Sequence, residues 1–288
     1  TTSTGTGSVT VGSVLTIGGS GTLNAGAKTW ILAGSGTPLV VTGTLTPATS
    51  TFQYTGTSAT NITATTYHHL SLIPAGTVTH TLGTASSQTV SVAGNMVIGN
   101  GTNAVTVNRA TNDPVVTVTG DLSVATNAIF SGAGSAAITV NGGDVTGNGT
   151  INLSGGTFLL DGAGNFGGDT AWFFNNLTFG NGAGVTTTTA TGAGGSNVTV
   201  AGVLTVAANQ TLNAGMKFWL LSGSGSPFVI SGTFNPGTSY VRFNYTAASP
   251  VGVTIPAASF YDFGVGTAAD TNPAVTYTAA SGTLTIQN

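Results

Sequence analysis

Residues 198–206 read VTVAGVLTV, a phrase of two short runs in which apolar and polar residues alternate. In an extended chain successive side chains point to opposite faces, so the apolar residues of each run share one face. Gly202, between the two runs, permits a bend or a bulge. The phrase therefore predicts two short β-strands, each with one face suited to burial, separated by a break at the glycine.

We call this pattern the glycine phrase, and it occurs three more times in the chain. Internal repeats identify repeat architectures, so they have to be found before a fold is assigned. Two neighbouring copies start twenty-odd residues apart, a spacing that suits one coil of a solenoid. The other copies are VTVGSVLTI at 9–17, VSVAGNMVI at 90–98 and VTVTGDLSV at 116–124.

An aromatic phrase also recurs, as YHHLSL at 67–72, FNNLTF at 174–179 and FYDFGV at 260–265. The first two copies each come before a glycine phrase, so the order of the phrases is shared. This order predicts three related modules, the middle one lengthened by an insertion. The predicted modules are residues 1–89 with an N-terminal polymerising end, residues 90–197 with the insertion, and residues 198–288 with a C-terminal strand.

The longest internal repeat places residues 14–47 over residues 203–236 without a gap, with 19 identities in 34 positions. Lys28 and Lys217, the only two lysines, occupy matching positions inside it. Duplication of a structural unit explains why both copies carry a lysine. Each lysine stem is expected to lie along an apolar surface with its head in water. A crosslink to an asparagine, or a subunit contact, stays open as a secondary interpretation.

The composition favours an all-β fold with many tight turns. Only 4% of the residues are charged and 40% are hydrophobic. Glu is absent and Lys, Arg and Met are scarce, which removes most of the good helix formers. Thr, Val, Gly, Ser and Asn dominate instead; Val and Thr favour strands, whereas Gly and Asn favour turns.

Two all-β architectures fit short strands with turn residues between them. One is a β-solenoid, a parallel β-helix-like rod built from degenerate repeats. The other is a row of tandem immunoglobulin-like β-sandwich modules. We favour the solenoid, because repeats of twenty-odd residues suit one coil and because no Pro-rich or charged linker separates the modules. Inward Val, Ile, Leu and Phe then form a continuous core beneath outward ladders of Thr and Ser.

The succession of an aromatic phrase, a Thr-rich stretch and a glycine phrase resembles the β-solenoid repeats of large secreted adhesin-type surface proteins of bacteria. The resemblance covers most of the chain. It implies export and a structural or adhesive role, and it implies no reaction. The residues that carry it are 67–72, 90–98, 174–179 and 198–206.

Charge and hydropathy argue against several classes of function. A net charge of −3 with four basic residues leaves no basic patch for nucleic acid. No apolar run approaches the roughly 18 residues of a membrane-spanning helix. Most aspartates stand alone at predicted turns, where they cap backbone amides, rather than in the pairs that glycosidases use. We therefore expect neither an enzyme nor a cofactor. The aspartates are Asp113, Asp121, Asp144, Asp161, Asp169, Asp262 and Asp270.

Two stretches contain the residue types of a metal site. His68 and His69 are adjacent, with His80 further on, but adjacent residues of a strand point to opposite faces, so we expect polar residues at a turn or an outer face. Residues 161–169, DGAGNFGGD, resemble half of a calcium-binding glycine-rich repeat. Such sites stack several copies and supply about six to eight oxygen ligands. The favoured interpretation is a Gly-rich turn, and we predict no metal site.

Part of a glycine phrase lies near each end of the sequence, with Val9 and Val11 in the first and Leu284 and Ile286 in the last. A solenoid end without a polar cap exposes a strand edge that invites another copy to continue the stack. Such a head-to-tail contact is open, so it makes filaments rather than closed dimers. These four residues are the predicted subunit interface.

We therefore expect a structural subunit of an extracellular filament or surface appendage, with copies of itself as partners. The chain has no cysteine, and a secreted protein of this size buries enough core to fold without disulfides. The alternative is a stalk or binding segment of a secreted adhesin. A third class, an enzyme on a solenoid scaffold, requires a groove of clustered carboxylates. Contact with a glycan or a cell surface is left open.

Overall fold

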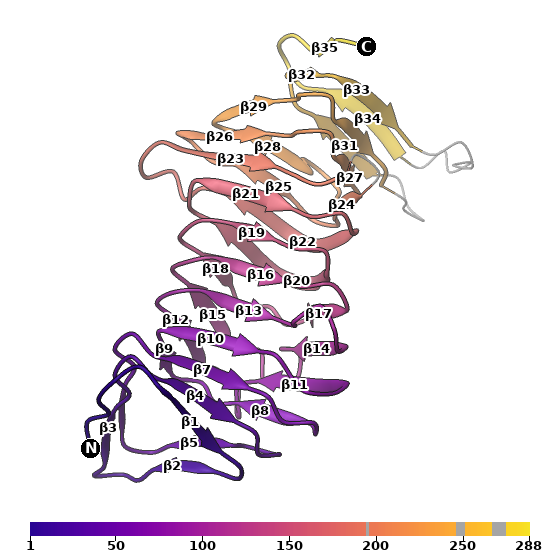
Figure 1. The fold of residues 1–288 in the computed structure, drawn as a ribbon. Helices are drawn as coiled ribbons and strands as arrows, with labels where there is room; N and C mark the ends of the chain where they lie inside the picture. Colours follow the sequence, from indigo (N-terminus) through magenta and orange to yellow (C-terminus); the bar gives the residue numbers. More distant parts are fainter. Residues whose placement is uncertain (194–195, 246–250, 267–274) are drawn as a thin grey trace. The chain divides into compact units, whose positions relative to one another are not determined.

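The computed structural model of the 288-residue chain describes residues 1–193, 196–245, 251–266 and 275–288. All regular secondary structure in these residues is β-strand, and strands of successive coils pair in parallel. The strands stack into a β-solenoid (Figure 1). The favoured architecture is thereby confirmed. The immunoglobulin-like alternative is wrong, because the sheets of such sandwiches are antiparallel.

The chain forms two compact units, Thr1–Ile151 and Asn152–Asn288, and we describe each by itself. In both units short strands are joined by corners rich in Gly, Pro, Asn and Ser, residues that favour turns. The three predicted modules follow sequence repeats rather than compactness, so their boundaries stay a prediction.

The first unit contains strands β1 to β19. Their bounds are β1 (Ser8–Val11), β2 (Leu15–Ile17), β3 (Thr22–Asn24), β4 (Thr29–Leu32), β5 (Leu39–Val41), β6 (Thr44–Thr46), β7 (Thr51–Tyr54), β8 (Thr60–Ile62), β9 (Thr66–Tyr67), β10 (His69–Leu72), β11 (Val78–Leu82), β12 (Thr89–Val92), β13 (Met96–Ile98), β14 (Val105–Asn108), β15 (Val115–Val118), β16 (Leu122–Val124), β17 (Ala128–Gly132), β18 (Ile138–Val140) and β19 (Val145–Thr146).

The second unit contains strands β21 to β35, and β20 (Thr150–Leu160) includes the boundary. Their bounds are β21 (Gly164–Gly167), β22 (Trp172–Phe179), β23 (Thr186–Ala190), β24 (Asn197–Val200), β25 (Leu204–Val206), β26 (Gln210–Asn213), β27 (Phe218–Leu221), β28 (Phe228–Ile230), β29 (Thr233–Asn235), β30 (Tyr240–Phe243), β31 (Val251–Ile255), β32 (Ser259–Phe260), β33 (Asp262–Val265), β34 (Val275–Ala279) and β35 (Thr285–Ile286).

One face of the first unit shows how the alternating pattern builds a core. Its strands stack in the order β1, β4, β7, β10, β13, β16 and β19. Each inward side chain lies on its counterpart in the coil before, and burial of each contributes up to about 1.5–3 kcal/mol. One such ladder contains Val9, followed by the buried residues Trp30, Phe52, Leu70, Met96, Leu122 and Val145.

The core of the second unit is richer in aromatic side chains. The ring of Trp219 lies 6.3 Å from that of Phe166 and 6.2 Å from that of Phe179, centroid to centroid. Both separations are within the range in which aromatic pairs are favourable. The matching inward ladder contains Trp172, Val198, Trp219, Val241 and Phe263.

The glycine of the glycine phrase lies at a crowded corner between two coils. The residue after it donates its backbone N–H to a side chain of the coil before, His69 Nδ1 in one copy and Asn176 Oδ1 in another, both at 2.9 Å. A Cβ on Gly94 would lie 2.5 Å from His69 Cε1, and one on Gly202 would lie 2.3 Å from Asn176 Oδ1. In these two copies the glycine leaves room for this hydrogen bond as well as for the bend, whereas the copy at 9–17 carries Ser13 at the equivalent position.

Candidate functional site

The predicted interface residues near the start of the chain lie on an edge strand. Val9 and Val11 belong to β1, which pairs with β4 and, among the described residues, with no other strand. Val9 lies opposite Trp30 and Val11 opposite Leu32. Both valines are half-buried and face the core. The outer backbone edge of β1 is therefore open in this part of the structure.

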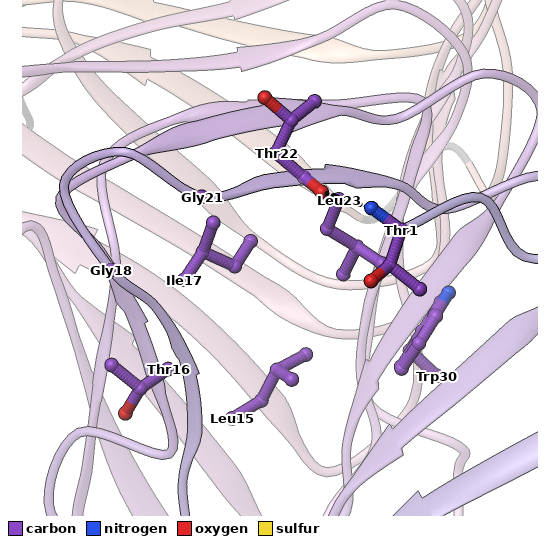
Figure 2. Close-up of a pocket in the computed structure, with 9 residues that line it drawn as sticks. All are labelled: Thr1, Leu15, Thr16, Ile17, Gly18, Gly21, Thr22, Leu23 and Trp30. Carbon is purple, nitrogen blue, oxygen red and sulfur yellow. Dashed lines mark hydrogen bonds between the residues drawn. The ribbon is translucent and has the colours of Figure 1, made fainter.

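A pocket of about 350 Å³ lies over the neighbouring strand β2. Its walls include Leu15 and Ile17 of β2, Leu23 of β3 and Trp30 of β4, whose side chains surround one space in Figure 2. Three of the four are buried, and Leu15 is half-buried. The pocket is therefore an apolar opening at the first coil of the core.

The pocket exists because residues 1–11 cover only two of the three strands that follow them. The N-terminal ammonium donates to Thr22 O at 2.8 Å and Ser3 N–H to Asn24 O at 2.9 Å, which places the first residues along β3. Strand β1 covers β4. Strand β2 pairs with β5, and no strand within the described ranges pairs with its other edge.

The predicted interface residues near the other end also lie on an edge that no strand of the described ranges covers. Ile286 of β35 lies opposite Phe260 of β32, and Leu284, which is half-buried, comes directly before this strand. The nearby strand β33 pairs with β30 and carries the exposed Val265. These residues belong to the second unit and Val9 and Val11 to the first, so the two surfaces are described separately.

Sequence reasoning missed the two strands that complete these surfaces, β2 and β33. It selected the first half of the glycine phrase at each end and passed over Leu15 and Phe263. The signal was present, because β2 is the second half of the glycine phrase at 9–17 and β33 carries the aromatic phrase at 260–265. Only the strand pairing shows that both strands have an edge without a partner in the part of the chain that the structure describes.

The two lysines of the long repeat have different surroundings. Lys28 is half-buried, whereas Lys217 is only 1% exposed. The Lys217 ammonium donates to the Gly168 carbonyl and the Ser196 hydroxyl. Burial lowers the pKa of Lys217, an effect that Asp169 opposes. The predicted position of the ammonium in water is therefore wrong for Lys217, because the preceding coil encloses it.

Glycines make the room that Lys217 occupies. A Cβ on Gly167 would lie 2.9 Å from the lysine Cε, and one on Gly192 would lie 2.8 Å from Nζ. The two acceptors named above are a carbonyl and a hydroxyl, whereas a crosslink requires the side-chain amide of an asparagine. In this arrangement the ammonium acts as a hydrogen-bond donor that joins corners of successive coils.

The prediction of polar residues at a turn is confirmed for His68, but the rings of His68 and His69 do not point to opposite faces. Their ring centroids are 4.3 Å apart with an interplanar angle of 71°. The reason is that His68 lies at the corner between β9 and β10 rather than inside a strand. Burial and then the neighbouring His68 lower the pKa of His69, and its Nδ1 holds a backbone N–H of the next coil. The pair is thus a corner structure.

The expected position at a turn or an outer face is wrong for His80, which is fully buried in β11 because its side chain points inward from the strand. Neither ring nitrogen has a hydrogen-bond partner among the described residues. Burial lowers its pKa to about 4, so the imidazole is neutral at pH 7. Its ring lies 6.4 Å from that of Tyr54, whose hydroxyl is 2.9 Å from that of Tyr67. This polar cluster carries a cost that apolar side chains would avoid.

Four aspartates hold backbone amides, as predicted, but the amides belong to the next coil; they are Asp113, Asp121, Asp161 and Asp169. This arrangement explains why single aspartates at corners suffice. Both aspartates of the calcium-like stretch are engaged in this way, and Asp270 lies outside the described residues. The pairs are Asp121 Oδ1 with Asp144 N–H at 2.8 Å, Asp161 Oδ1 with Asn181 N–H at 2.8 Å, and Asp169 Oδ1 with Ala193 N–H at 2.7 Å.

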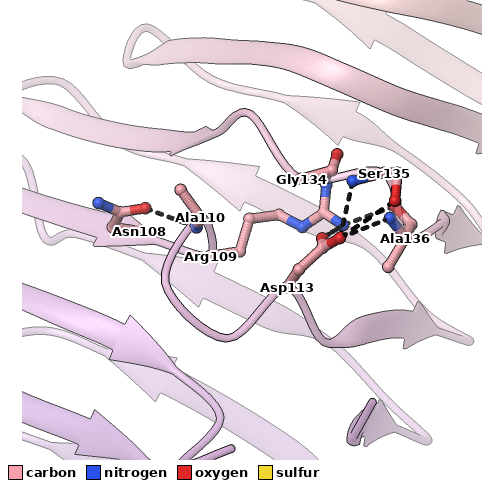
Figure 3. Close-up of polar contacts among 7 residues, drawn as sticks. All are labelled: Asn108, Arg109, Ala110, Asp113, Gly134, Ser135 and Ala136. Atoms are coloured by element: carbon pink, nitrogen blue, oxygen red, sulfur yellow. Dashed lines mark hydrogen bonds and ion pairs between the residues drawn. The ribbon is translucent and has the colours of Figure 1, made fainter. Parts of the chain in front are cut away.

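The most extensive cluster of this kind surrounds Arg109, which is fully buried. Its guanidinium pairs with Asp113 at 2.5 Å and donates to the carbonyl of Gly134 at 3.4 Å (Figure 3). Asp113 also accepts the backbone N–H groups of Ser135 and Ala136. Burial lowers the pKa of Arg109, and Asp113 opposes this effect. The ion pair lies within one turn, and the contacts with residues 134–136 join this turn to the next coil, so the cluster holds the two coils together.

Comparisons of the chain with protein-family models, with curated proteins and with solved structures gave no match. Within the described ranges, no helix has the length and apolar character that crossing a membrane requires. The same residues contain no group of three or more His, Asp or Glu side chains able to hold a metal ion. The open strand edges are therefore the strongest indication of a function.

Proposed function

We propose that the chain is a structural subunit that assembles head to tail, through its strand edges, into an extracellular filament or surface appendage. The observation that carries this proposal is the exposure of apolar side chains beside open backbone edges on both surfaces. Val14 is 46% exposed, Val265 45% and Ile286 50%. Open edges of this kind accept further strands.

The geometry of a parallel stack supports an open assembly. The surface that carries Val9 and Val11 differs from the surface that carries Leu284 and Ile286, so a contact between them is heterologous. A heterologous contact that does not close on itself produces a filament. Each added subunit satisfies backbone groups and buries apolar surface, the two gains that stabilise the stacked coils themselves.

The polar side chains of the interior also support a structural role. Arg109, Asp113 and Lys217 all bind groups of adjacent coils, as described above. Charge is used here to fix corners rather than to form a cluster that binds substrate. We therefore propose no enzymatic activity for this chain.

Electron microscopy and analytical ultracentrifugation of the purified chain over a range of concentrations test the proposal. We expect filaments of uniform width whose amount rises with protein concentration. Few ion pairs are available for screening, so assembly should change little between about 0.05 and 0.5 M salt. Monodisperse monomers at all concentrations would rule out the filament.

An adhesin stalk or binding segment is the second candidate. It is favoured by the solenoid itself, combined with the resemblance of the phrases to secreted adhesin-type repeats. In that case the chain joins other segments of one polypeptide rather than separate copies. A gene that continues into a distinct terminal domain, with no self-assembly of the 288-residue chain, would favour the stalk.

The extracellular location is part of the proposal and has its own test. Antibodies against the chain should label intact cells of the producing organism, and protease added outside the cells should remove the label. Label that appears only after the cells are opened would contradict export.

A further inference from the structure

We infer that the joint between two copies is a strand exchange, in which the last coil of one copy (β33, β34 and β35) replaces residues 1–13 of the next, and β33 fills the bare edge of β2. Residues 1–13 are called the N-terminal arm below. The inference rests on the proposed head-to-tail assembly and gives it a register. Val9 and Val11 then hold the arm in place before assembly and are not part of the final joint.

The arm resembles the last residues of the chain. Residues 1–13, TTSTGTGSVTVGS, align without a gap with residues 276–288, TYTAASGTLTIQN. In this alignment the Val-Thr-Val of β1 falls on the Leu-Thr-Ile that includes β35. Both strands are first halves of a glycine phrase, so they suit the same place beside β4. In the single chain β1 occupies that place.

The pairing that would fill the bare edge of β2 already occurs twice inside the chain. Strand β10 pairs with β13, and β22 pairs with β25. In both cases the strand with an aromatic phrase lies beside the second half of a glycine phrase. Strand β33 carries the third aromatic phrase, and β2 is the second half of the first glycine phrase. The repeat therefore places Phe263 of one copy opposite Leu15 of the next.

The corner hydrogen bond of the internal pairs has matching groups at the joint. His69 and Asn176 each accept the N–H of the residue that follows the glycine, at 2.9 Å. Asp262 holds the same place in the third aromatic phrase, and Val14 supplies the corresponding N–H. Ser13 stands where the internal pairs have glycine, so this corner has to make room for the serine Cβ when the arm is released. In the single chain one oxygen of Asp262 accepts a hydrogen bond from the side-chain amide of Asn288 at 3.0 Å. In the joint the N–H of Val14 replaces this amide as the donor.

Two backbone hydrogen bonds follow from the same register. The N–H of Leu70 donates to Asn95 O at 3.1 Å, and that of Leu177 to Val203 O at 3.0 Å, which predicts a bond from Phe263 N–H to Val14 O. At the other end of the strand, the residues after β13 and β25 donate to the last residues of β10 and β22 at 2.8 and 3.0 Å. The matching bond joins Gly18 N–H to Val265 O.

The apolar side chains also match the interior pattern. The counterparts of Phe263 in the two internal pairs, Leu70 and Leu177, are fully buried. Phe263 is half-buried and Val265 is exposed in the single chain. The joint would cover both, and it would close the apolar pocket over Leu15 (Figure 2). Burial of this surface supplies the driving force for exchange.

The arm competes with the incoming coil from within its own chain. A tethered segment has an effective concentration in the millimolar range, so it disfavours exchange at low protein concentration. Weakening the arm should therefore promote assembly. If Val9 and Val11 were joint residues instead, weakening them would prevent assembly.

The double substitution V9D/V11D distinguishes these two arrangements. Both valines face the core, so aspartates there release the arm, and we expect the protein concentration at which filaments appear to fall about tenfold or more. The matched control is the double substitution S8D/T10D, which adds the same charge on the exposed face of β1 and should have little effect. Thermal unfolding followed by circular dichroism verifies that the rest of each variant is folded.

Substitutions at Asp262 test the other side of the joint. Asp262→Ala removes the acceptor for the Val14 N–H and should raise the concentration needed for assembly about tenfold. Asp262→Asn should assemble normally, because Asn176 serves in the corresponding internal corner. Asn288→Ala removes the intramolecular donor alone and should not weaken assembly. Hydrogen exchange on wild-type filaments should show slowed exchange at the Gly18 amide relative to the monomer.

The outcomes distinguish failure of the strand-exchange proposal from failure of the filament proposal. Promotion by V9D/V11D, rescue by Asp262→Asn and protection at Gly18 support the strand exchange. Wild-type filaments that disappear in V9D/V11D overturn the exchange and leave the filament standing. Monomers in every variant at every concentration overturn both.

Discussion

The two copies of the long repeat, residues 14–47 and 203–236, have the same local structure. In each copy the tryptophan donates its indole N–H to a carbonyl five residues earlier, at 3.2 Å. The glycine of each Asn-Ala-Gly turn has a φ of 65°, a left-handed conformation that glycine adopts without strain. Sequence identity is therefore sufficient to reproduce the backbone.

The copies differ in what covers them. Trp30 is 8% exposed and borders a pocket, whereas Trp219 is 0% exposed. Leu15 is half-buried, whereas its counterpart Leu204 is buried beneath β22. The difference teaches that a repeat determines the conformation of its own coil, and that the neighbouring coil determines the environment of its side chains.

The largest expected effect concerns the tryptophans. Trp219→Ala should lower the free energy of unfolding by about 3–5 kcal/mol, because it opens a cavity in a closed aromatic cluster. Trp30→Ala should cost about 1–2 kcal/mol less, because its surroundings already include a pocket. Urea denaturation of the dilute, monomeric protein measures both. Equal losses would show that the two coils are equally covered.

A pH effect of somewhat smaller size comes from His80. His80 is the third residue of VTHTL in β11. The similar sequence VTYTA in β34 has the half-buried Tyr277 at this position. Burial lowers the pKa of His80 from 6.5 to about 4 in the folded state. Between these two pH values the unfolded state therefore binds more protons than the folded state. Stability should therefore rise by about 3 kcal/mol from pH 4 to pH 7.

Urea denaturation of wild type and His80→Phe at several pH values measures this rise. Most of this rise in stability should be absent in His80→Phe. The part that remains is assigned to His69, whose pKa is also lowered. A rise of the same size in His80→Phe would place the titrating group elsewhere.

The lysines provide the next test of the difference between the copies. Lys217→Ala leaves the Gly168 carbonyl and the Ser196 hydroxyl without their donor, and it should cost about 2–3 kcal/mol. Lys28→Ala should stay within about 0.5 kcal/mol. Lys217→Met keeps most of the volume, so it separates the lost hydrogen bonds from the cavity. Thermal denaturation compares all three, and equal effects at the two positions would remove the distinction.

The smallest expected effect tests the equivalence of corners. His69→Ala loses the acceptor of a backbone N–H and should destabilise the chain by about 1 kcal/mol. His69→Asn should be close to neutral, because Asn176 makes the same 2.9 Å hydrogen bond in the other aromatic phrase. Chemical denaturation at pH 7 decides between them. Asn behaving no better than Ala would mean that the two corners are not equivalent.

Much of the fold could be predicted because each repeated phrase specifies both a strand and the corner beside it. Alternation placed the inward residues correctly, as Val198 and Val200 are buried. The glycine at each corner marked the break between strands. These features are local, and local geometry is what a short phrase specifies.

Other features depend on the coil that lies alongside, which a phrase does not specify. The identical TLNAG segments gave no sign that Lys217 is enclosed and Lys28 is not. The adjacency of His68 and His69 gave no sign that the corner at His68 brings the two rings to within 4.3 Å. The open edge of β2 was missed for the same reason, since it depends on which strand is absent beside it among the described residues.

The hydrogen bonds that join corner N–H groups to the side chains of His69, Asn95 and Asp121 run in one direction along the chain. His69 receives the N–H of Asn95, Asn95 Oδ1 that of Asp121, and Asp121 that of Asp144. Each acceptor is therefore synthesised before its donor. A ribosome that releases the chain from the N-terminus delivers each of these donors to a coil whose side-chain acceptor is already in place. Folding in the order of synthesis then needs only neighbours about twenty residues apart, and each finished coil serves as the template for the next.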